Sequence, residues 1–241
     1  MGVSITNPIS ALATIRGWIE RAATAYVCVT PVSGIMAAQR DPAVMRALNG
    51  ADMVVPDGMP TVWAGRWAGA EGIGRVYGPD LMESTCELAA ERGWSTFLYG
   101  GAPGVAERLA SNLEGRFPGI RIAGTHTPPF RELSEGEKAD VARAIDASGA
   151  DIVWVGLSTP KQDLWMADVV DRLTTPTVLV GVGAAFDVHS GLVKRPPAWL
   201  GPLGLFWLYR LIQEPRRLWR RYAVDIPQFV AGVLRRRPHI R

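Results

Sequence analysis

The stretch Ile152-Val153-Trp154-Val155-Gly156, followed by a segment from Lys161 to Leu173, decides the fold. The first part is a continuous apolar run rich in β-branched residues, which is typical of a strand buried on both faces of a sheet. The second part mixes polar and apolar residues as an amphipathic helix does. A buried strand followed by such a helix predicts one unit of a parallel α/β sheet.

This pairing of strand and helix recurs along the chain. Further helices are expected at 35–48, 80–91, 104–117 and 135–147, and further buried strands at 26–30, 53–56, 96–99, 120–124 and 177–181. Right-handed crossovers bring the carboxyl ends of such strands to one edge of the sheet, where open α/β folds bind ligands. The sequence therefore predicts a Rossmann-like α/β fold, with a mostly parallel sheet covered by helices and a ligand site at that edge.

The composition is that of a globular protein. The 241 residues are 48% hydrophobic and 20% charged, which excludes a disordered chain. Cys28 and Cys86 lie inside apolar segments without metal-ligand spacing, so we expect reduced, buried thiols and neither a disulfide nor a zinc site. The N-terminus lacks the pattern of a signal peptide, and no run approaches the roughly 20 apolar residues of a membrane-spanning helix.

Charge is distributed unevenly between the two ends of the chain. From Lys194 to Arg241 there are 11 Lys and Arg against two acidic residues, whereas residues 1–193 hold 15 basic and 21 acidic residues. The composition changes at Lys194-Arg195-Pro196-Pro197. We therefore expect a catalytic core at 1–193 and a basic appendage at 194–241, and we expect the appendage to meet an anionic partner.

The appendage has helical periodicity between residues 203 and 222, interrupted at Pro215. Its apolar residues, including Trp219 and Tyr222, fall on one stripe, and its arginines fall largely on another. This pattern suits an anionic membrane surface, and it equally suits an amphipathic helix packed on its own domain. Nucleic acid is disfavoured because the aromatic residues look like anchors rather than stacking platforms.

Three polar residues stand where strands end or helices begin. Asp57 follows the strand at 53–56, where it could cap the next helix or act as a general base. Arg75 could clamp a phosphate or carboxylate, or form a surface ion pair. Gln162, in Pro160-Lys161-Gln162, opens a predicted helix, and a polar side chain at such a start can bind a ligand carbonyl or hydroxyl.

Two glycine-rich turns are also candidates. Gly100 and Gly101 join a strand to a helix, either as a tight turn or as a phosphate site at a helix N-terminus. The segment from Gly181 to Asp187 resembles a dinucleotide fingerprint but lacks the acidic residue expected about 20 positions later, so a nucleotide-dependent oxidoreductase is a weak alternative. No Asp-x-Asp pair occurs, so we expect arginines or helix dipoles, rather than a metal, to stabilise a leaving diphosphate.

Taken together, these segments resemble the WecG/TagA/CpsF family of bacterial glycosyltransferases, carbohydrate-active family twenty-six. The resemblance covers about Ala25 to Tyr222, and the matching segments are 51–58, 75–82, 97–101, 160–162, 181–187, 207–210 and 214–222. It implies inverting, metal-independent transfer from a UDP-sugar, without a cofactor, to a polyprenyl-diphosphate-linked saccharide in cell-surface or exopolysaccharide synthesis. It also implies a cytoplasmic protein, bound peripherally at the inner face of the plasma membrane.

The resemblance also assigns roles to residues. Asp57 would be the general base, and the expected donor-binding set is Thr30, Arg75, Gly100, Gly101, Gln162, Arg210, Arg217 and Arg220. The family often has Thr and Asn after its first core strand, but Val29-Thr30-Pro31-Val32-Ser33 lacks the Asn. This departure leaves the donor sugar open. The segments 78–82 and 128–130 resemble exopolysaccharide members of the family, some of which transfer glucuronic acid, so the donor is expected to be of ManNAc type or glucuronic acid type. The alternative from another class is a non-catalytic membrane-surface adaptor, against which Asp57, Arg75 and Gln162 together argue.

Overall fold

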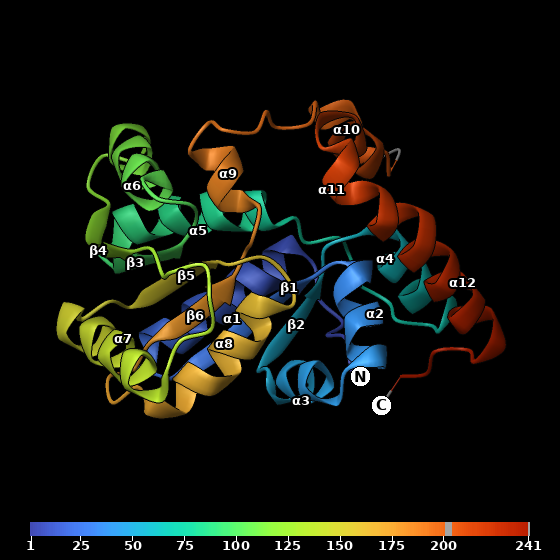
Figure 1. Ribbon diagram of the computed structural model, residues 1–241, viewed down its shortest axis with the longest axis horizontal. Helices are drawn as coiled ribbons and strands as arrows, with labels where there is room; N and C mark the ends of the chain where they lie inside the picture. The colour runs from blue at the N-terminus through green and yellow to red at the C-terminus, as the bar shows by residue number, and fades with distance from the viewer. Residues whose placement is uncertain (201–203, 241) are drawn as a thin grey trace.

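The computed structural model describes residues 1–200 and 204–240, and at its centre lies a six-stranded sheet (Figure 1). The strand order is β2-β1-β6-β5-β3-β4, and every neighbouring pair is parallel. The strands are β1 (Ala25–Thr30), β2 (Met53–Pro56), β3 (Ser95–Gly100), β4 (Arg121–His126), β5 (Ile152–Gly156) and β6 (Val178–Gly181). The predicted Rossmann-like α/β sheet is therefore confirmed.

Burial explains why the strands are continuous apolar runs. Every residue of β1, β2, β3 and β6 is buried, whereas β4, at one edge of the sheet, is partly exposed throughout. β6 is the last strand in the chain but lies in the middle of the sheet, between β1 and β5. It alone joins the pair β2-β1 to the group β5-β3-β4.

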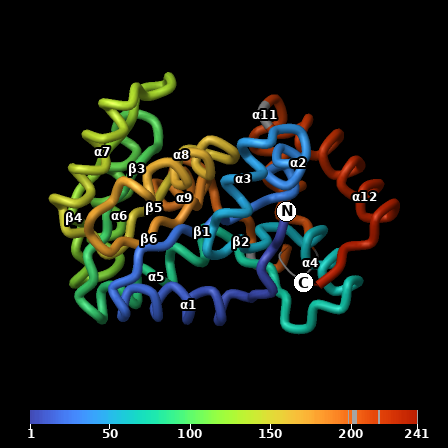
Figure 2. Tube along the Cα trace, turned by 90° about the horizontal axis from the view of Figure 1, so that it is seen from below, coloured from blue at the N-terminus to red at the C-terminus, as the bar shows by residue number. Residues whose placement is uncertain are grey.

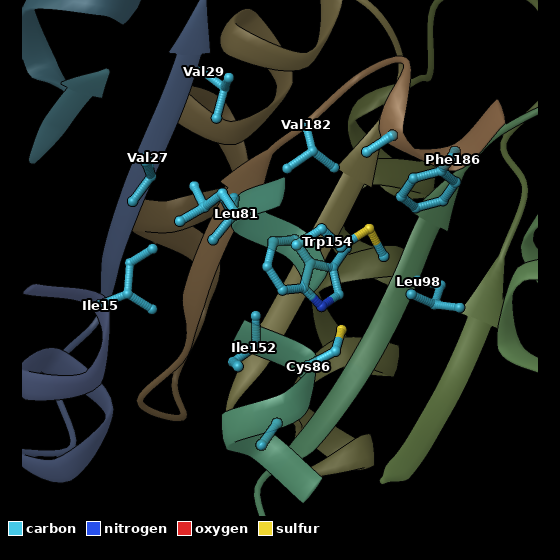
Figure 3. Packing of buried hydrophobic residues seen from close by; sticks show 14 of the residues in the cluster. Ile15, Val27, Val29, Leu81, Cys86, Leu98, Ile152, Trp154, Val182 and Phe186 are labelled. Atoms are coloured by element: carbon cyan, nitrogen blue, oxygen red, sulfur yellow. The ribbon is translucent and has the colours of Figure 1, made fainter. Parts of the chain in front are cut away.

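Helices cover both faces of the sheet (Figure 2). On one face α1 (Pro8–Glu20), α5 (Gly78–Arg92), α6 (Val105–Arg116) and α9 (Ala185–His189) pack around Trp154, which is fully buried among Leu81, Cys86 and Ile152 (Figure 3). On the other face α2 (Val32–Arg40), α3 (Pro42–Gly50), α7 (Glu135–Ser148) and α8 (Lys161–Val169) bury Tyr99, Trp165 and their neighbours. The alternation of side chains along each strand thus supplies two separate cores.

The helix predicted at 35–48 is two helices in the structure, which is a correction to the sequence analysis. α2 ends at Arg40, and α3 begins at Pro42. Proline has no amide hydrogen to donate within a helix, so it favours a new first turn. The carboxylate of Asp41 accepts a hydrogen bond of 2.8 Å from the amide of Ala43 and caps that turn.

The appendage is a chain of short helices that packs on the core. It consists of a 3₁₀ turn, η2 (Ala198–Leu200), then α10 (Phe206–Gln213), α11 (Pro215–Arg220), the π-helical turn η3 (Arg221–Asp225) and α12 (Ile226–Arg235). α12 runs beside α2 and α4 (Met59–Trp67) (Figure 1). Arg40 donates a hydrogen bond of 2.7 Å to Asp225, and Arg237 donates one of 2.8 Å to the carbonyl of Trp67. Within the described residues, no helix is long and apolar enough to span a membrane.

Candidate active site

A cleft of about 400 Å³ lies at the carboxyl edge of the sheet, between the core and the appendage. The core contributes the residues that follow β1, β2, β5 and β6. The appendage forms a wall with residues of α10, α11, η3 and α12, including Phe206, Trp207, Arg210, Leu218 and Tyr222. The edge of the sheet predicted to bind a ligand therefore carries a cleft that the appendage completes.

Asp57 directly follows the carboxyl end of β2 and lines this cleft. Its amide donates a hydrogen bond of 3.1 Å to the carbonyl of Thr30, so the end of β1 fixes its backbone. The backbone of Gly78, in the first turn of α5, also lowers the pKa of the Asp57 carboxyl group. One carboxylate oxygen, Oδ1, is buried beside Arg75 and has no hydrogen-bond partner among the described residues. Because 25% of the side chain is exposed, the rest of the carboxylate can meet a ligand in the cleft.

Burial raises the pKa of Asp57 from its ordinary 3.8 to about 6. The guanidinium groups of Arg75 and Arg210 oppose this rise, because a nearby positive charge favours the ionised carboxylate. A carboxyl group that titrates near neutral pH can accept a proton in one step and release it in another. Asp57 thus has the environment of a general base.

Arg75 is held beside Asp57 by two aromatic rings. Its Nη2 lies 3.9 Å from Asp57 Oδ1, and only 16% of its side chain is exposed. Its guanidinium carbon lies 4.6 Å from the ring centre of Tyr77 and 4.3 Å from that of Phe206. Since Phe206 belongs to α10, the appendage contacts this core arginine directly. The structure thus places Arg75 within the cleft and not in a surface ion pair.

Gln162 lies in the first turn of α8 and is 1% exposed. Its Oε1 is buried without a hydrogen-bond partner in the described part of the chain, although the side chain lines the cleft. The amide packs against Gly181 and Gly183, where an added Cβ would lie 3.0 to 3.2 Å from its atoms. A Cβ on Gly181 would also meet Met166 Cε at 2.6 Å, and Gly183 has a φ of 49°, so close packing and backbone conformation account for these two glycines without a dinucleotide.

Arg210 projects from α10 into the same cleft. It forms an ion pair of 2.6 Å with Glu214, one turn later on the helix, and its side chain is only 12% exposed. Its Nε is buried and has no hydrogen-bond partner within residues 1–200 and 204–240. Because a guanidinium donates several hydrogen bonds in a fixed geometry, Arg210 keeps donor capacity for an anionic ligand.

Four of the other expected donor-binding residues, Thr30, Gly100, Gly101 and Arg220, are not among the described residues that line the cleft. Thr30 is buried, and its hydroxyl donates a hydrogen bond of 3.2 Å to the carbonyl of Cys28. Gly100 and Gly101 form the turn after β3, where a Cβ on Gly100 would come within 2.8 Å of the Gly156 backbone. Arg220 is exposed on α11 with its guanidinium 5.9 Å from the ring of Trp219. The side chain of Arg217 lies outside the part of the chain that the structure describes.

Tyr77, Phe206 and Tyr222 are aromatic residues of the cleft that the sequence analysis does not place in the site. Tyr77 and Phe206 contact Arg75, and Tyr222 lines the appendage wall with its ring 5.4 Å from that of Trp207. Tyr77 lies inside the segment that carries Arg75, which is the signal that could have identified it. Of the two surroundings that the apolar stripe suits, a membrane or its own domain, Tyr222 has the second, because α10 ends before Pro215 and one helical phase does not extend across it.

Comparison with known proteins agrees with this geometry. The chain matches the profile of the family described as Glycosyl transferase WecG/TagA/CpsF over residues 1–241. A protein of Bacillus spizizenii, named N-acetylglucosaminyldiphosphoundecaprenol N-acetyl-beta-D-mannosaminyltransferase, is 34% identical over 87% of this chain and 78% of its own. A protein of the same name in Bacillus subtilis is 30% identical over 91% of this chain and 83% of its own.

Proposed function

The chain belongs to the WecG/TagA/CpsF family of glycosyl transferases, and from this premise we propose that it transfers a sugar, with inversion, from a UDP-sugar to a polyprenyl-diphosphate-linked saccharide. One observation carries the proposal. A carboxylate, two guanidinium groups and an amide, from Asp57, Arg75, Arg210 and Gln162, converge on one cleft at the carboxyl edge of the sheet. This set supplies a base for an acceptor hydroxyl and cations for a leaving diphosphate.

In the proposed reaction Asp57 takes the proton from the acceptor hydroxyl. The hydroxyl oxygen attacks the anomeric carbon while the bond from that carbon to UDP breaks, so the configuration inverts in one displacement. Negative charge grows on UDP, and Arg75 and Arg210 stabilise it in a cleft from which the appendage excludes water. No metal is required, because these two cations occupy the role that a divalent ion plays elsewhere.

The names of the two relatives indicate the acceptor class. Each acts, by its name, on N-acetylglucosaminyl-diphosphoundecaprenol and transfers N-acetylmannosamine. We extend the acceptor class, a polyprenyl diphosphate that carries a sugar, to this chain. The donor that we propose is a UDP-sugar of ManNAc type, as in the names of the relatives, or of glucuronic acid type. The choice stays open because Pro31-Val32-Ser33, which line the cleft, depart from the family pattern.

A lipid-linked acceptor requires the enzyme to work at a membrane surface. The appendage exposes apolar side chains next to its arginines: Trp207, Leu208, Ile212, Trp219, Val230 and Leu234. Apolar anchors with surrounding positive charge bind anionic bilayers. We therefore assign residues 194–241 to peripheral binding at the inner, cytoplasmic face of the plasma membrane, and residues 1–193 to the catalytic core.

The proposal is tested with purified protein, a panel of UDP-sugars and a short-chain polyprenyl-diphosphate GlcNAc acceptor. Mass spectrometry should detect one product heavier than the acceptor by a single sugar, together with released UDP. Product formation with one donor supports the transferase. Binding of the acceptor without product or UDP release from any donor would instead indicate a non-catalytic adaptor and would contradict the proposal.

A further inference from the structure

The guanidinium of Arg75 lies against two neighbouring aromatic rings, one from the core and one from the appendage. The ring of Tyr77 belongs to the core at the start of α5, and the ring of Phe206 belongs to the appendage at the start of α10. The two rings also contact each other edge to face, with centres 5.3 Å apart and planes at 66°. A guanidinium within 6 Å of a ring face is attracted by the ring's electrons.

Contact with Asp57 alone does not fix the position of Arg75. The closest approach of their charged atoms is 3.9 Å, which is too long for a hydrogen bond, and Asp57 Oδ1 has no partner in the described residues. An arginine side chain has many rotamers, so holding it in one of them needs contacts along its faces. Phe206, at the start of α10, supplies one of these ring contacts, and Tyr77 supplies the other.

We propose that Phe206 is a positioning residue: by stacking on Arg75 it keeps the guanidinium charge beside the Asp57 carboxylate. The inference rests on the proposed function only in taking Asp57 as the base. It adds a second task to the appendage wall, because α10 acts on the core's own catalytic group as well as contributing Arg210.

Several charged or titratable groups face Asp57, and their contacts show which one depends on Phe206 for its position. Tyr77 and Asp80 face it from α5 and its start, Arg210 from α10, Tyr222 from η3, and Arg75 from the segment before α5. Arg210 has its own ion pair with Glu214. Arg75 is therefore the cation whose place depends on the ring. Its withdrawal should raise the pKa of Asp57 further, since an opposite charge lowers a carboxyl pKa.

Thermal melting at a series of pH values tests this without any turnover. Because folding raises the pKa of Asp57 from 3.8 to about 6, its contribution to stability is fully present below 3.8 and is lost as pH rises through about 6. The difference in Tm between the native chain and Asp57→Asn reports this loss. A Phe206→Leu background removes the ring but keeps an apolar side chain, so the pKa of Asp57 should be higher there. The Asp57-dependent fall in Tm should therefore extend to a pH about one unit higher than in the native chain.

Two further variants separate stacking from simple packing. Phe206→Tyr keeps the ring and should restore the native pH dependence, whereas Leu208→Ala, an exposed position on the same helix outside the cleft lining, should leave it unchanged. If the Asp57-dependent titration of Phe206→Leu coincides with that of the native chain, the proposal is wrong. Absence of sugar transfer by the native chain would contradict the proposed function but would not affect this measurement.

Turnover on a soluble acceptor gives a second readout. The acidic limb of kcat/KM should move to higher pH in Phe206→Leu and return in Phe206→Tyr. In an Arg75→Gln background Phe206→Leu should cause little additional loss, because the ring acts through the arginine. Independent, multiplying losses from the two substitutions would show that Phe206 acts otherwise and would overturn the inference.

Discussion

At the residue scale, the cleft places one carboxylate under two opposing influences. Burial favours the neutral form of Asp57, and the guanidinium groups favour the ionised form, so its pKa is about 6. A base is useful only when it is ionised and can still hold the proton that it accepts. The result is a group suited to proton transfer near neutral pH, and its surroundings make this role testable.

Replacing Asp57 with Asn should lower turnover by roughly 10² to 10⁴ while UDP still binds, because the amide cannot accept the proton. In the native chain kcat/KM should fall as pH drops through about 6, and Asp57→Asn should lack this limb. The matched control is Asp140→Asn, an exposed carboxylate on α7. Turnover close to that of the native chain in Asp57→Asn would remove Asp57 from the mechanism.

Arg210 should be needed even when no membrane is present. Arg210→Ala, measured on a soluble short-chain acceptor, should lower kcat by about 10²-fold, since a buried cation that stabilises the leaving diphosphate is lost. Arg216→Ala removes an exposed arginine of α11 from outside the cleft lining and should keep native turnover. Equal rates for the two variants, with unchanged melting curves, would show that the appendage wall does not take part in the chemistry.

The residues that sequence reasoning found are those whose chemistry shows in their type and place. Asp57 follows a strand, Gln162 opens a helix and Arg75 is a guanidinium in the segment before α5, and all three line the cleft. Phe206 and Tyr222 could not be found in this way, because an aromatic residue in an amphipathic helix has the same pattern whether it faces a ligand, a neighbour or a membrane. Which of these three surroundings each aromatic ring has depends on how the chain folds after Leu200.

At the scale of elements, prolines decide where helical phase is lost. Pro42 divides one expected helix into α2 and α3, and Pro215 begins α11 one residue after the end cap of α10. The π-helical turn η3 then shifts the phase again before α12. The apolar stripe predicted across residues 203–222 is therefore not continuous in the structure. Trp219 is exposed, whereas Tyr222 lines the cleft.

This division predicts that Trp219 serves the membrane and not the chemistry. Trp219→Ala should weaken binding to vesicles that contain anionic lipid, because an aromatic anchor is lost, while turnover on a soluble acceptor stays native. High salt should weaken vesicle binding of both proteins by screening the arginines. Co-sedimentation measures the binding, and Ile9→Ala, an exposed apolar position on α1, is the control. Vesicle binding unchanged by Trp219→Ala would contradict the assignment.

At the scale of the whole molecule, cations on two separate parts of the chain meet at one site. Arg75 comes from the core and Arg210 from the appendage, so we expect activity to persist in EDTA. The measurement is product formation after exhaustive chelation, with Mg²⁺ and Mn²⁺ restored in parallel samples. Loss of activity with EDTA and its recovery with either ion would show that the arginines do not replace a metal.

The sheet could be predicted from the sequence because its strands are short apolar runs separated by helices of clear periodicity. What could not be predicted is how the appendage lies on the core. Arg40 with Asp225 and Arg237 with the carbonyl of Trp67 join residues far apart in the chain, and nothing in these residue types marks them as partners. Such contacts leave no periodic signal, so the closed cleft is visible only in three dimensions.

The central position of β6 in the sheet limits how far the nascent chain can fold during synthesis. Synthesis proceeds from the N-terminus, and until residues 178–181 leave the ribosome β1 and β5 each present an open edge of unpaired amides and carbonyls. The two strand groups can form beforehand but cannot join. Every nascent chain therefore passes through a stage in which two strand edges are exposed and prone to aggregate. A chain that ends before Val178 would keep both edges exposed, so we expect chaperones to bind it or proteases to degrade it. Arg210 and Phe206 of α10 are made later still, so the wall that they contribute to the cleft forms only after the sheet can close.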